Sequence, residues 1–196
     1  KQLNKIVPNT QGGENTHITK NIYPNSVYEE ETQGLAGDEV NWQTKKTRHI
    51  TLGNQTLAHI DVNPQGTVEK ILVFGDHLGS SSILTDSFSR VKTLYDYYPF
   101  GSTRLDTGDG FHVSAYQYTG KELDKETGLN YYGARYYEAN IGKFTQPDPA
   151  VLNDVISLLS DPQSLNYYSY AGNNPIRYND PNGETKQKLP GAILKL

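Results

Sequence analysis

Three kinds of side chain in this sequence could take part in chemistry: histidines, a run of serines, and two of the three aspartates that precede prolines. The histidines are scattered without the spacing of metal ligands, and Ser80-Ser81-Ser82 lacks the Gly-x-Ser-x-Gly context of a serine nucleophile. Asp148 and Asp180 lie in Asp-Pro pairs, which commonly form turns because the carboxylate bonds to downstream backbone. The histidines are His17, His49, His59, His77 and His112. By themselves these residues predict neither a metal site nor a cofactor.

The composition excludes several classes of function. The 196 residues contain no cysteine, which excludes a disulfide scaffold, a thiolate metal site and cysteine catalysis. The formal charge is −4 and the basic residues are scattered, so we predict no nucleic-acid partner. The longest apolar run, near residues 71–74, is far too short to cross a bilayer, so we predict no direct membrane insertion.

Short runs of β-branched and aromatic residues dominate the chain from about Thr47 onward. Gly, Asn, Asp and Pro separate these runs at intervals that are typical of consecutive antiparallel hairpins. The predicted strands are residues 48–52, 56–62, 68–74, 81–85 and 91–97. We therefore predict an all-β fold.

Two segments differ from this pattern. Residues 1–45 are rich in Asn, Gln, Thr, Glu and Gly and poor in large apolar groups, so we expect them to be loop-like or to borrow order from a neighbour. In residues 151–160 the apolar side chains recur at i, i+3, i+4 and i+7, between two Asp-Pro pairs. We predict one short amphipathic helix there, inserted between β elements.

Tyrosines are concentrated in the second half of the chain, where thirteen of the fifteen lie at or after Tyr95. Several form adjacent pairs, and neighbouring residues in a strand point to opposite faces of a sheet. We expect such tyrosines to pack rings inward, with their hydroxyls bonded to nearby backbone. The pairs are Tyr97-Tyr98, Tyr131-Tyr132, Tyr136-Tyr137 and Tyr167-Tyr168.

A series of motifs in this half resembles a known family. Asp76-His77-Leu78-Gly79 and then Tyr95-Asp96-Tyr97 are similar to the tyrosine–aspartate (YD) repeats of the RHS family of large bacterial proteins. The motifs that follow resemble the RHS repeat-associated core domain, so that the resemblance covers roughly residues 70–183. In order they are Tyr118-Thr119-Gly120-Lys121-Glu122, Thr127-Gly128-Leu129, Tyr131-Tyr132-Gly133-Ala134-Arg135-Tyr136-Tyr137, Gly142-Lys143-Phe144, Pro147-Asp148-Pro149, Asn173-Asn174-Pro175 and Asp180-Pro181-Asn182-Gly183.

The resemblance implies antiparallel strand-turn strips of YD repeats wound into a spiral shell, with a core or plug domain that curls inward. In the family such shells enclose a C-terminal toxin for delivery, as in the C components of Tc toxins. Together with the composition, this implies four regions. They are a polar segment of weakly ordered or degenerate repeats at 1–45, YD-repeat hairpins at 46–101, the core domain at 102–183 and a C-terminal tail at 184–196.

The resemblance also implies a reaction. In many relatives the core domain cuts its own chain downstream, as an intramolecular aspartate protease that needs neither metal nor cofactor. The family pattern places the catalytic residues at Arg135, Asp148 and Asp180 of this sequence. Such chemistry needs two carboxylates close together, one activating water while the other protonates the carbonyl or leaving group, and a guanidinium that holds one of them. Arg135 could equally be structural, stacked on an aromatic ring.

The chain departs from the family pattern at two points. Asp148 and Asp180 are 32 residues apart, which is more than in the common bacterial version, and the excess coincides with the predicted helix. An insertion between two fixed elements costs little closure entropy, so the carboxylates can still meet. After Gly183 the chain has Glu184 where relatives commonly have Leu, which bears on the position of the cut.

Three functions stay open at this point: the C-terminal shell and core region of an RHS-type polymorphic toxin that cuts itself once at most, a non-catalytic adhesion scaffold similar to teneurins, and a degenerate core domain without activity. The expected partners are the N-terminal remainder of the same polypeptide, a C-terminal effector segment, and secretion or delivery machinery. The chain begins at Lys1, has no methionine and shows no signal-peptide pattern. We therefore expect a piece of a longer polypeptide that is secreted or displayed on a cell surface, with its targeting signals elsewhere.

Overall fold

The structure is a computed structural model that describes residues 2–7, 17–25, 27–35, 39–52, 55–108, 114–124, 127–149 and 162–189. These residues form antiparallel strands, 3₁₀ helices and loops, without an α-helix, so the predicted all-β class is confirmed. The helix predicted at 151–160 lies outside the described residues. The chain divides into two compact units: the first comprises residues 1–52, 56–73 and 85–90, and the second comprises 53–55, 74–84 and 91–196.

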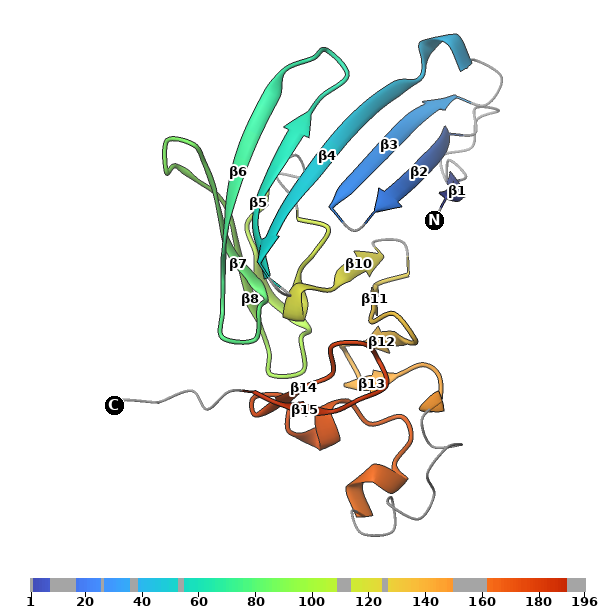
Figure 1. Ribbon diagram of the computed structural model, residues 1–196, viewed down its shortest axis with the longest axis vertical. Helices are drawn as coiled ribbons and strands as arrows, with labels where there is room; N and C mark the ends of the chain where they lie inside the picture. The colour runs from blue at the N-terminus through green and yellow to red at the C-terminus, as the bar shows by residue number, and fades with distance from the viewer. Residues whose placement is uncertain are drawn as a thin grey trace. The chain divides into compact units, whose positions relative to one another are not determined.

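Nine strands follow one another in a meander whose order in the sheet is their order in the chain. They are β1 (Gln2–Val7), β2 (His17–Asn25), β3 (Tyr28–Leu35), β4 (Gln43–Leu52), β5 (Gln55–Val62), β6 (Val68–Gly75), β7 (Ser81–Asp86), β8 (Val91–Tyr97) and β9 (Thr103–Asp106). All five predicted strands are present, and β4 begins five residues before its predicted start. Figure 1 shows β2 to β5 side by side.

The polar N-terminal segment contributes strands to this meander. Strands β1, β2 and β3 pair antiparallel with their neighbours, and β3 in turn pairs with β4. In the β3–β4 register Glu30 lies opposite Lys46 and Glu31 lies opposite Lys45. Of the two alternatives for residues 1–45, the described parts therefore take their order from neighbouring strands.

Two turns of the meander repeat the same chemistry. In the first, Asp76 Oδ1 accepts the backbone N–H groups of Leu78 and Ser80 at 2.8 Å each. In the second, Asp86 Oδ1 accepts the N–H groups two and four residues downstream, at 2.9 and 3.0 Å. An aspartate at the start of a turn satisfies backbone donors that the hairpin leaves unpaired. Repeated Asp turns thus account for the regular spacing of the strands.

Among its described residues, the second unit contains a smaller four-stranded sheet, a two-stranded sheet and three 3₁₀ helices. The strands are β10 (Glu122–Asp124), β11 (Leu129–Tyr131), β12 (Tyr136–Glu138) and β13 (Lys143–Phe144), followed by the pair β14 (Tyr178–Asn179) and β15 (Gln187–Lys188). The 3₁₀ helices are η2 (Tyr118–Gly120), η4 (Pro162–Leu165) and η5 (Ala171–Asn173), and a fourth, η1 (Glu39–Asn41), belongs to the first unit. These short elements are linked by turns, several of which need glycine at positive φ.

An aromatic core holds the second unit together. Its members, each 8% exposed or less, are Tyr118, Tyr132, Tyr137, Ala139, Phe144, Tyr170 and Ala171. The buried tyrosines keep hydrogen-bond partners: Tyr118 Oη donates to Pro99 O at 2.8 Å, and Tyr137 Oη donates to Phe100 O at 2.7 Å. Burial raises the pKa of both hydroxyls well above the usual value for tyrosine. They therefore stay protonated and act as structural donors.

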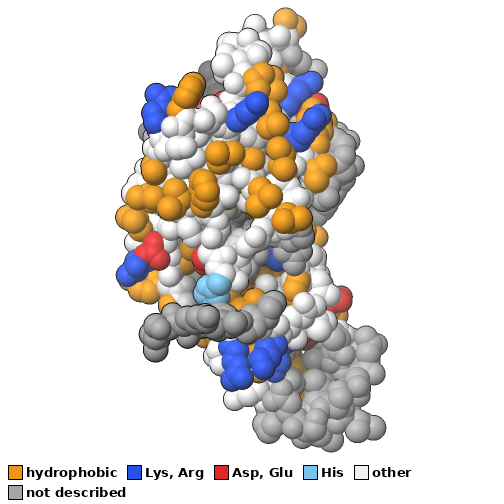
Figure 2. Space-filling model, turned by 60° about the vertical axis from the view of Figure 1, so that its left-hand side comes forward, with side chains coloured by type: hydrophobic (Ala, Val, Ile, Leu, Met, Phe, Trp, Pro, Cys, Tyr) orange, Lys and Arg blue, Asp and Glu red, His pale blue; other side chains and the backbone are white. Residues whose placement is uncertain are grey.

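Large hydrophobic side chains are also exposed on the first unit. They include Ile50, Leu52, Leu57, Val68 and Leu72, which lie on β4, β5 and β6. Figure 2 shows hydrophobic side chains gathered on one face of the molecule. Among the described residues there is no helix with the length and apolar character required to span a membrane.

Candidate active site

Arg135 is held in the turn between β11 and β12. The turn is closed by the Tyr132 N–H, which donates to Arg135 O at 3.0 Å, and Gly133 adopts a φ of 93° within it. The Arg135 side chain is 2% exposed, and its Cζ lies 3.7 Å from the centroid of the Phe144 ring. The stacking anticipated for Arg135 is therefore present, and it fixes the plane of the guanidinium.

The two aspartates reach Arg135 from different elements. Asp148 follows β13, where its backbone N–H donates to Tyr167 O at 3.0 Å, and its side chain is 21% exposed. Asp180 follows β14 and has a side chain that is only 4% exposed. Arg135 Nη2 lies 2.9 Å from Asp148 Oδ2 and 3.2 Å from Asp180 Oδ2. The structure thus brings all three residues predicted from the family pattern together on one guanidinium.

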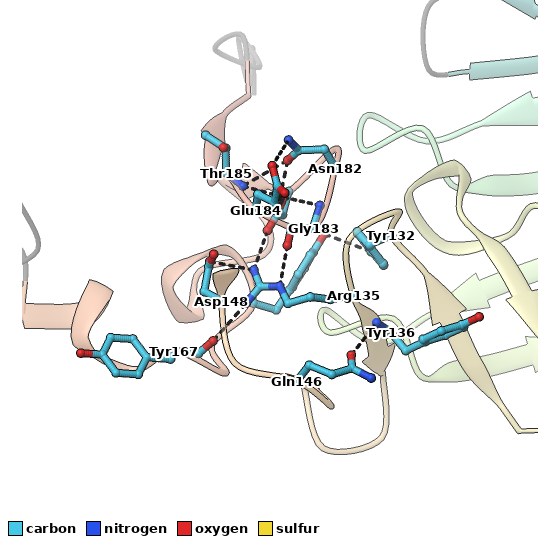
Figure 3. Close-up of polar contacts among 12 residues, drawn as sticks. Tyr132, Arg135, Tyr136, Gln146, Asp148, Tyr167, Asn182, Gly183, Glu184 and Thr185 are labelled. Atoms are coloured by element: carbon cyan, nitrogen blue, oxygen red, sulfur yellow. Dashed lines mark hydrogen bonds and ion pairs between the residues drawn. The ribbon is translucent and has the colours of Figure 1, made fainter. Parts of the chain in front are cut away.

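The other two nitrogens of the Arg135 guanidinium donate to backbone carbonyls. Nη1 donates to Tyr167 O at 3.0 Å, and Nε donates to Gly183 O at 2.5 Å. Figure 3 shows these contacts converging from Tyr167, Asp148 and Gly183. A buried guanidinium costs much less when its charge and its donors all have partners. Arg135 therefore ties three separate chain segments to the aromatic core.

Asp180 also forms the turn that was expected of an aspartate before proline. Its Oδ1 accepts the backbone N–H groups of Gly183, Glu184 and Thr185, at 2.9, 3.1 and 3.1 Å. Its Oδ2 faces Arg135, so the two oxygens divide between backbone and guanidinium. The carboxylate consequently lies next to the nitrogen atoms of the segment that follows Gly183.

Sequence patterns missed several groups at this site. The carbonyls of Tyr167 and Gly183 bind Arg135, but a backbone acceptor has no signature in residue type. Lys121 was noted only as part of a motif, yet its Nζ donates to Pro181 O at 2.6 Å across 60 residues of sequence. The motif that contains Lys121 was the one available signal. Within the described parts of the chain, no cluster of three or more His, Asp or Glu side chains could hold a metal ion.

Comparison with known proteins places this chain in a family. Residues 41–176 match the teneurin YD-shell family, and the chain belongs to that family. The YD-repeat resemblance seen in the sequence is thereby confirmed.

Individual relatives carry different names. Salivary gland surface protein 1 of Aedes aegypti is 38% identical over 121 residues, which are 61% of this chain and 3% of that protein. Toxin subunit YenC2 of Yersinia entomophaga is 37% identical over 107 residues, which are 53% of this chain and 10% of that protein. The tRNA nuclease WapA of Bacillus subtilis (strain 168) is 36% identical over 106 residues, which are 54% of this chain and 4% of that protein.

Solved structures share the fold. The crystal structure of TcdB2-TccC3 without its hypervariable C-terminal region aligns with a TM-score of 0.75 at 25% identity, covering 92% of this chain and 8% of that chain. The crystal structure of TcdB2-TccC3-Cdc42 also aligns with a TM-score of 0.75, at 24% identity, covering 93% of this chain and 8% of that chain. The chain thus spans a tenth or less of the length of these relatives.

Proposed function

We propose that this chain is the C-terminal shell and core region of an RHS-type polymorphic toxin. In this proposal YD-repeat strips wind into a spiral shell, the core domain curls inward as a plug, and the shell encloses a C-terminal effector. The polypeptide is secreted or displayed on a cell surface, and its partners are its own N-terminal remainder, the effector segment and the delivery machinery. Relatives named as toxin subunits and as a nuclease support this assignment.

The observation that supports a self-cleavage activity is the contact of the Asp148 and Asp180 carboxylates with one nitrogen of Arg135. The same guanidinium binds Gly183 O, and Asp180 Oδ1 lies 3.1 Å from the Glu184 nitrogen. One peptide bond, Gly183–Glu184, therefore has a cation at its carbonyl oxygen and a carboxyl group at its nitrogen. These groups suit an intramolecular aspartate-type cut, made once in cis without metal or cofactor.

The chemistry divides between the two aspartates. Asp148, the more exposed of the pair, takes a proton from a water molecule, whose oxygen bonds to the Gly183 carbonyl carbon. Arg135 stabilises the negative charge that develops on the carbonyl oxygen. Asp180 holds the turn as a carboxylate until it takes up one proton from solvent, and it then gives that proton to the Glu184 nitrogen as the C–N bond breaks. The products are a carboxylate at Gly183 and an amine at Glu184.

The test is the intact mass of the longer natural polypeptide that contains this chain, together with its Asp148→Asn and Asp180→Asn variants. We expect the wild type to yield a fragment ending at Gly183, and both variants to stay uncut. Asp96→Asn is the matched control, because Asp96 also pairs with an arginine, Arg104, on the surface of the same unit. Cutting that persists in both site variants would remove the assignment.

A scaffold function is the second candidate, and the Aedes aegypti relative named as a surface protein favours it. In that case the contacts of Arg135 and Asp180 serve only to fix the C-terminal turn, and Glu184 marks a core domain without activity. A wild-type polypeptide that stays full length in the same mass measurement would support the scaffold.

A further inference from the structure

The turn formed by residues 180–183 is held by a donor on each of three successive carbonyls. Pro181 O accepts from Lys121 Nζ at 2.6 Å, Asn182 O accepts from the Ala134 N–H at 3.1 Å, and Gly183 O accepts from Arg135 Nε at 2.5 Å. Two of these three donors are charged side chains. The turn is therefore clamped between two cations, of which only Arg135 is among the catalytic residues of the family pattern.

We propose that Lys121 is a positioning residue for the 180–183 turn, and that its charge offsets the second of the two carboxylates at the site. This role deepens the proposed self-cleavage and rests on it, because the turn carries the Gly183–Glu184 bond. Lys121 contacts the turn and none of the reacting atoms, so it acts through Asp180 and Pro181.

Two hydrogen bonds hold the backbone of Lys121 in place. Its N–H donates to Tyr118 O at 3.0 Å, and its carbonyl accepts from the Gln117 N–H at 2.9 Å. Lys121 thus sits at the junction of η2 and β10, with an anchored starting point for a long side chain. The ammonium then lies 5.4 Å from the centroid of the Tyr132 ring, which is 1% exposed. The contacts with the ring and with the carbonyl offset the conformational entropy that is lost when so long a side chain is ordered.

Charge balance gives the second part of the argument. Asp148 and Asp180 bring two negative charges against the one positive charge of Arg135, and Asp180 is almost fully buried. Burial lowers the pKa of Lys121, and attraction to the Asp180 carboxylate opposes that shift. With both aspartates ionised, Lys121 is therefore the second cation of the cluster of Arg135, Asp148, Asp180 and Lys121. The other titratable groups beside this cluster are Glu184, Tyr132 and Tyr170.

The experiment uses the longer natural polypeptide with Lys121→Met, Lys121→Gln and Lys121→Arg. We expect Lys121→Met to cut at least tenfold more slowly, with a pH–rate profile moved to higher pH, because loss of a nearby positive charge favours protonated carboxyl groups. Lys121→Gln retains a neutral donor, so the rate recovers in part while the profile stays displaced. Lys121→Arg should restore both the cleavage rate and the pH–rate profile. A wild-type rate and profile in Lys121→Met would overturn the role.

A second readout separates this role from the cleavage itself. The N–H groups of Gly183, Glu184 and Thr185 donate to Asp180, so hydrogen exchange in this segment reports the order of the turn. We expect exchange there to be at least tenfold faster in Lys121→Met, with no change in β11 and β12, which shows that the variant is folded. Lys143→Met, which removes another half-buried lysine of the same unit, serves as the control.

The cleavage measurement and the hydrogen-exchange measurement test the two proposals separately. A wild type that is never cut, together with faster exchange in Lys121→Met, refutes the protease and supports the positioning role. Unchanged exchange in Lys121→Met refutes the positioning role, whether or not the wild type is cut.

Discussion

Two histidines that look unrelated in the sequence form a buried pair in the first unit. His49 Nδ1 lies 2.9 Å from His59 Nδ1, and the two side chains belong to β4 and β5. His49 Nε2 also lies 3.4 Å from Glu29 Oε1. The pKa of His59 is lowered to about 4, chiefly because burial disfavours the charged ring and also because His49 is adjacent. Protonation of this pair at low pH is therefore expected to affect the stability of the first unit.

The first unit should lose stability as the pH falls from 6.5 toward 4. His59 in the unfolded chain binds a proton near pH 6.5, whereas the folded chain resists protonation until about pH 4. Below 6.5 the unfolded state therefore binds more protons, and the loss reaches roughly 3 kcal/mol at about 1.4 kcal/mol per pKa unit. Asp61 and Glu29 favour the charged ring, and Lys45 disfavours it, so these three neighbours modulate the size of the effect.

Hydrogen exchange in β4 and β5 at pH 4.5 and pH 7 measures this loss. His59→Gln, which keeps a polar side chain that does not titrate in this range, should remove most of the difference between the two pH values. The same difference in the variant and the wild type would show that other groups are responsible.

At the scale of elements, the turn between β8 and β9 requires a glycine at position 101. Gly101 adopts a φ of 90°, and a Cβ at this position would overlap the ring of Tyr118, a member of the aromatic core. Gly128 adopts a similar φ of 73° in the turn before β11, but nothing lies within 4 Å of its Cβ direction. The two turns share the same backbone strain and differ in their packing.

Gly101→Ala should therefore destabilise the second unit more than Gly128→Ala does. Each substitution costs about 1 kcal/mol for the left-handed backbone, and the displaced Tyr118 ring adds about 1–3 kcal/mol at Gly101 only. Denaturant unfolding of both variants, followed by the near-ultraviolet signal of the buried tyrosines, compares the two free energies. Equal losses would mean that the aromatic core yields to the extra methyl group without cost.

At the scale of the whole molecule, the exposed hydrophobic side chains of the first unit predict self-association of the 196-residue chain on its own. Leu52 and Val68 are 70% and 56% exposed, which is unusual for a surface that stays in water. We expect sedimentation velocity to show association that rises with concentration. Leu52→Ser together with Val68→Ser should weaken it several-fold.

The matched control replaces a polar pair of the same unit, Glu30 on β3 and Lys46 on β4. Glu30→Ser together with Lys46→Ser removes side chains that lie 3.5 Å apart, and it should leave association unchanged. Monomeric behaviour of the unaltered chain at every concentration would contradict the prediction.

The sequence by itself determined the class of fold and the identity of the candidate site residues. Short β-branched runs between Asp, Asn and Gly turns have one physical outcome, antiparallel hairpins, and for that reason the strands from β4 to β8 were predictable. Residues 1–45 were less predictable, because polar strands with little apolar surface acquire order only by pairing. The same limit applies to the histidines, since cross-strand contact depends on register and leaves no trace in local spacing.

Tertiary structure alone decided how the site is assembled. The contacts of Arg135 with the carbonyls of Tyr167 and Gly183, and of Lys121 with that of Pro181, join segments between 32 and 60 residues apart through backbone acceptors that every residue possesses. Residue types and motifs can name the charged groups of such a site. Only the packing of the aromatic core beneath the turns sets which carbonyl each of those groups reaches, because that packing fixes where each segment ends.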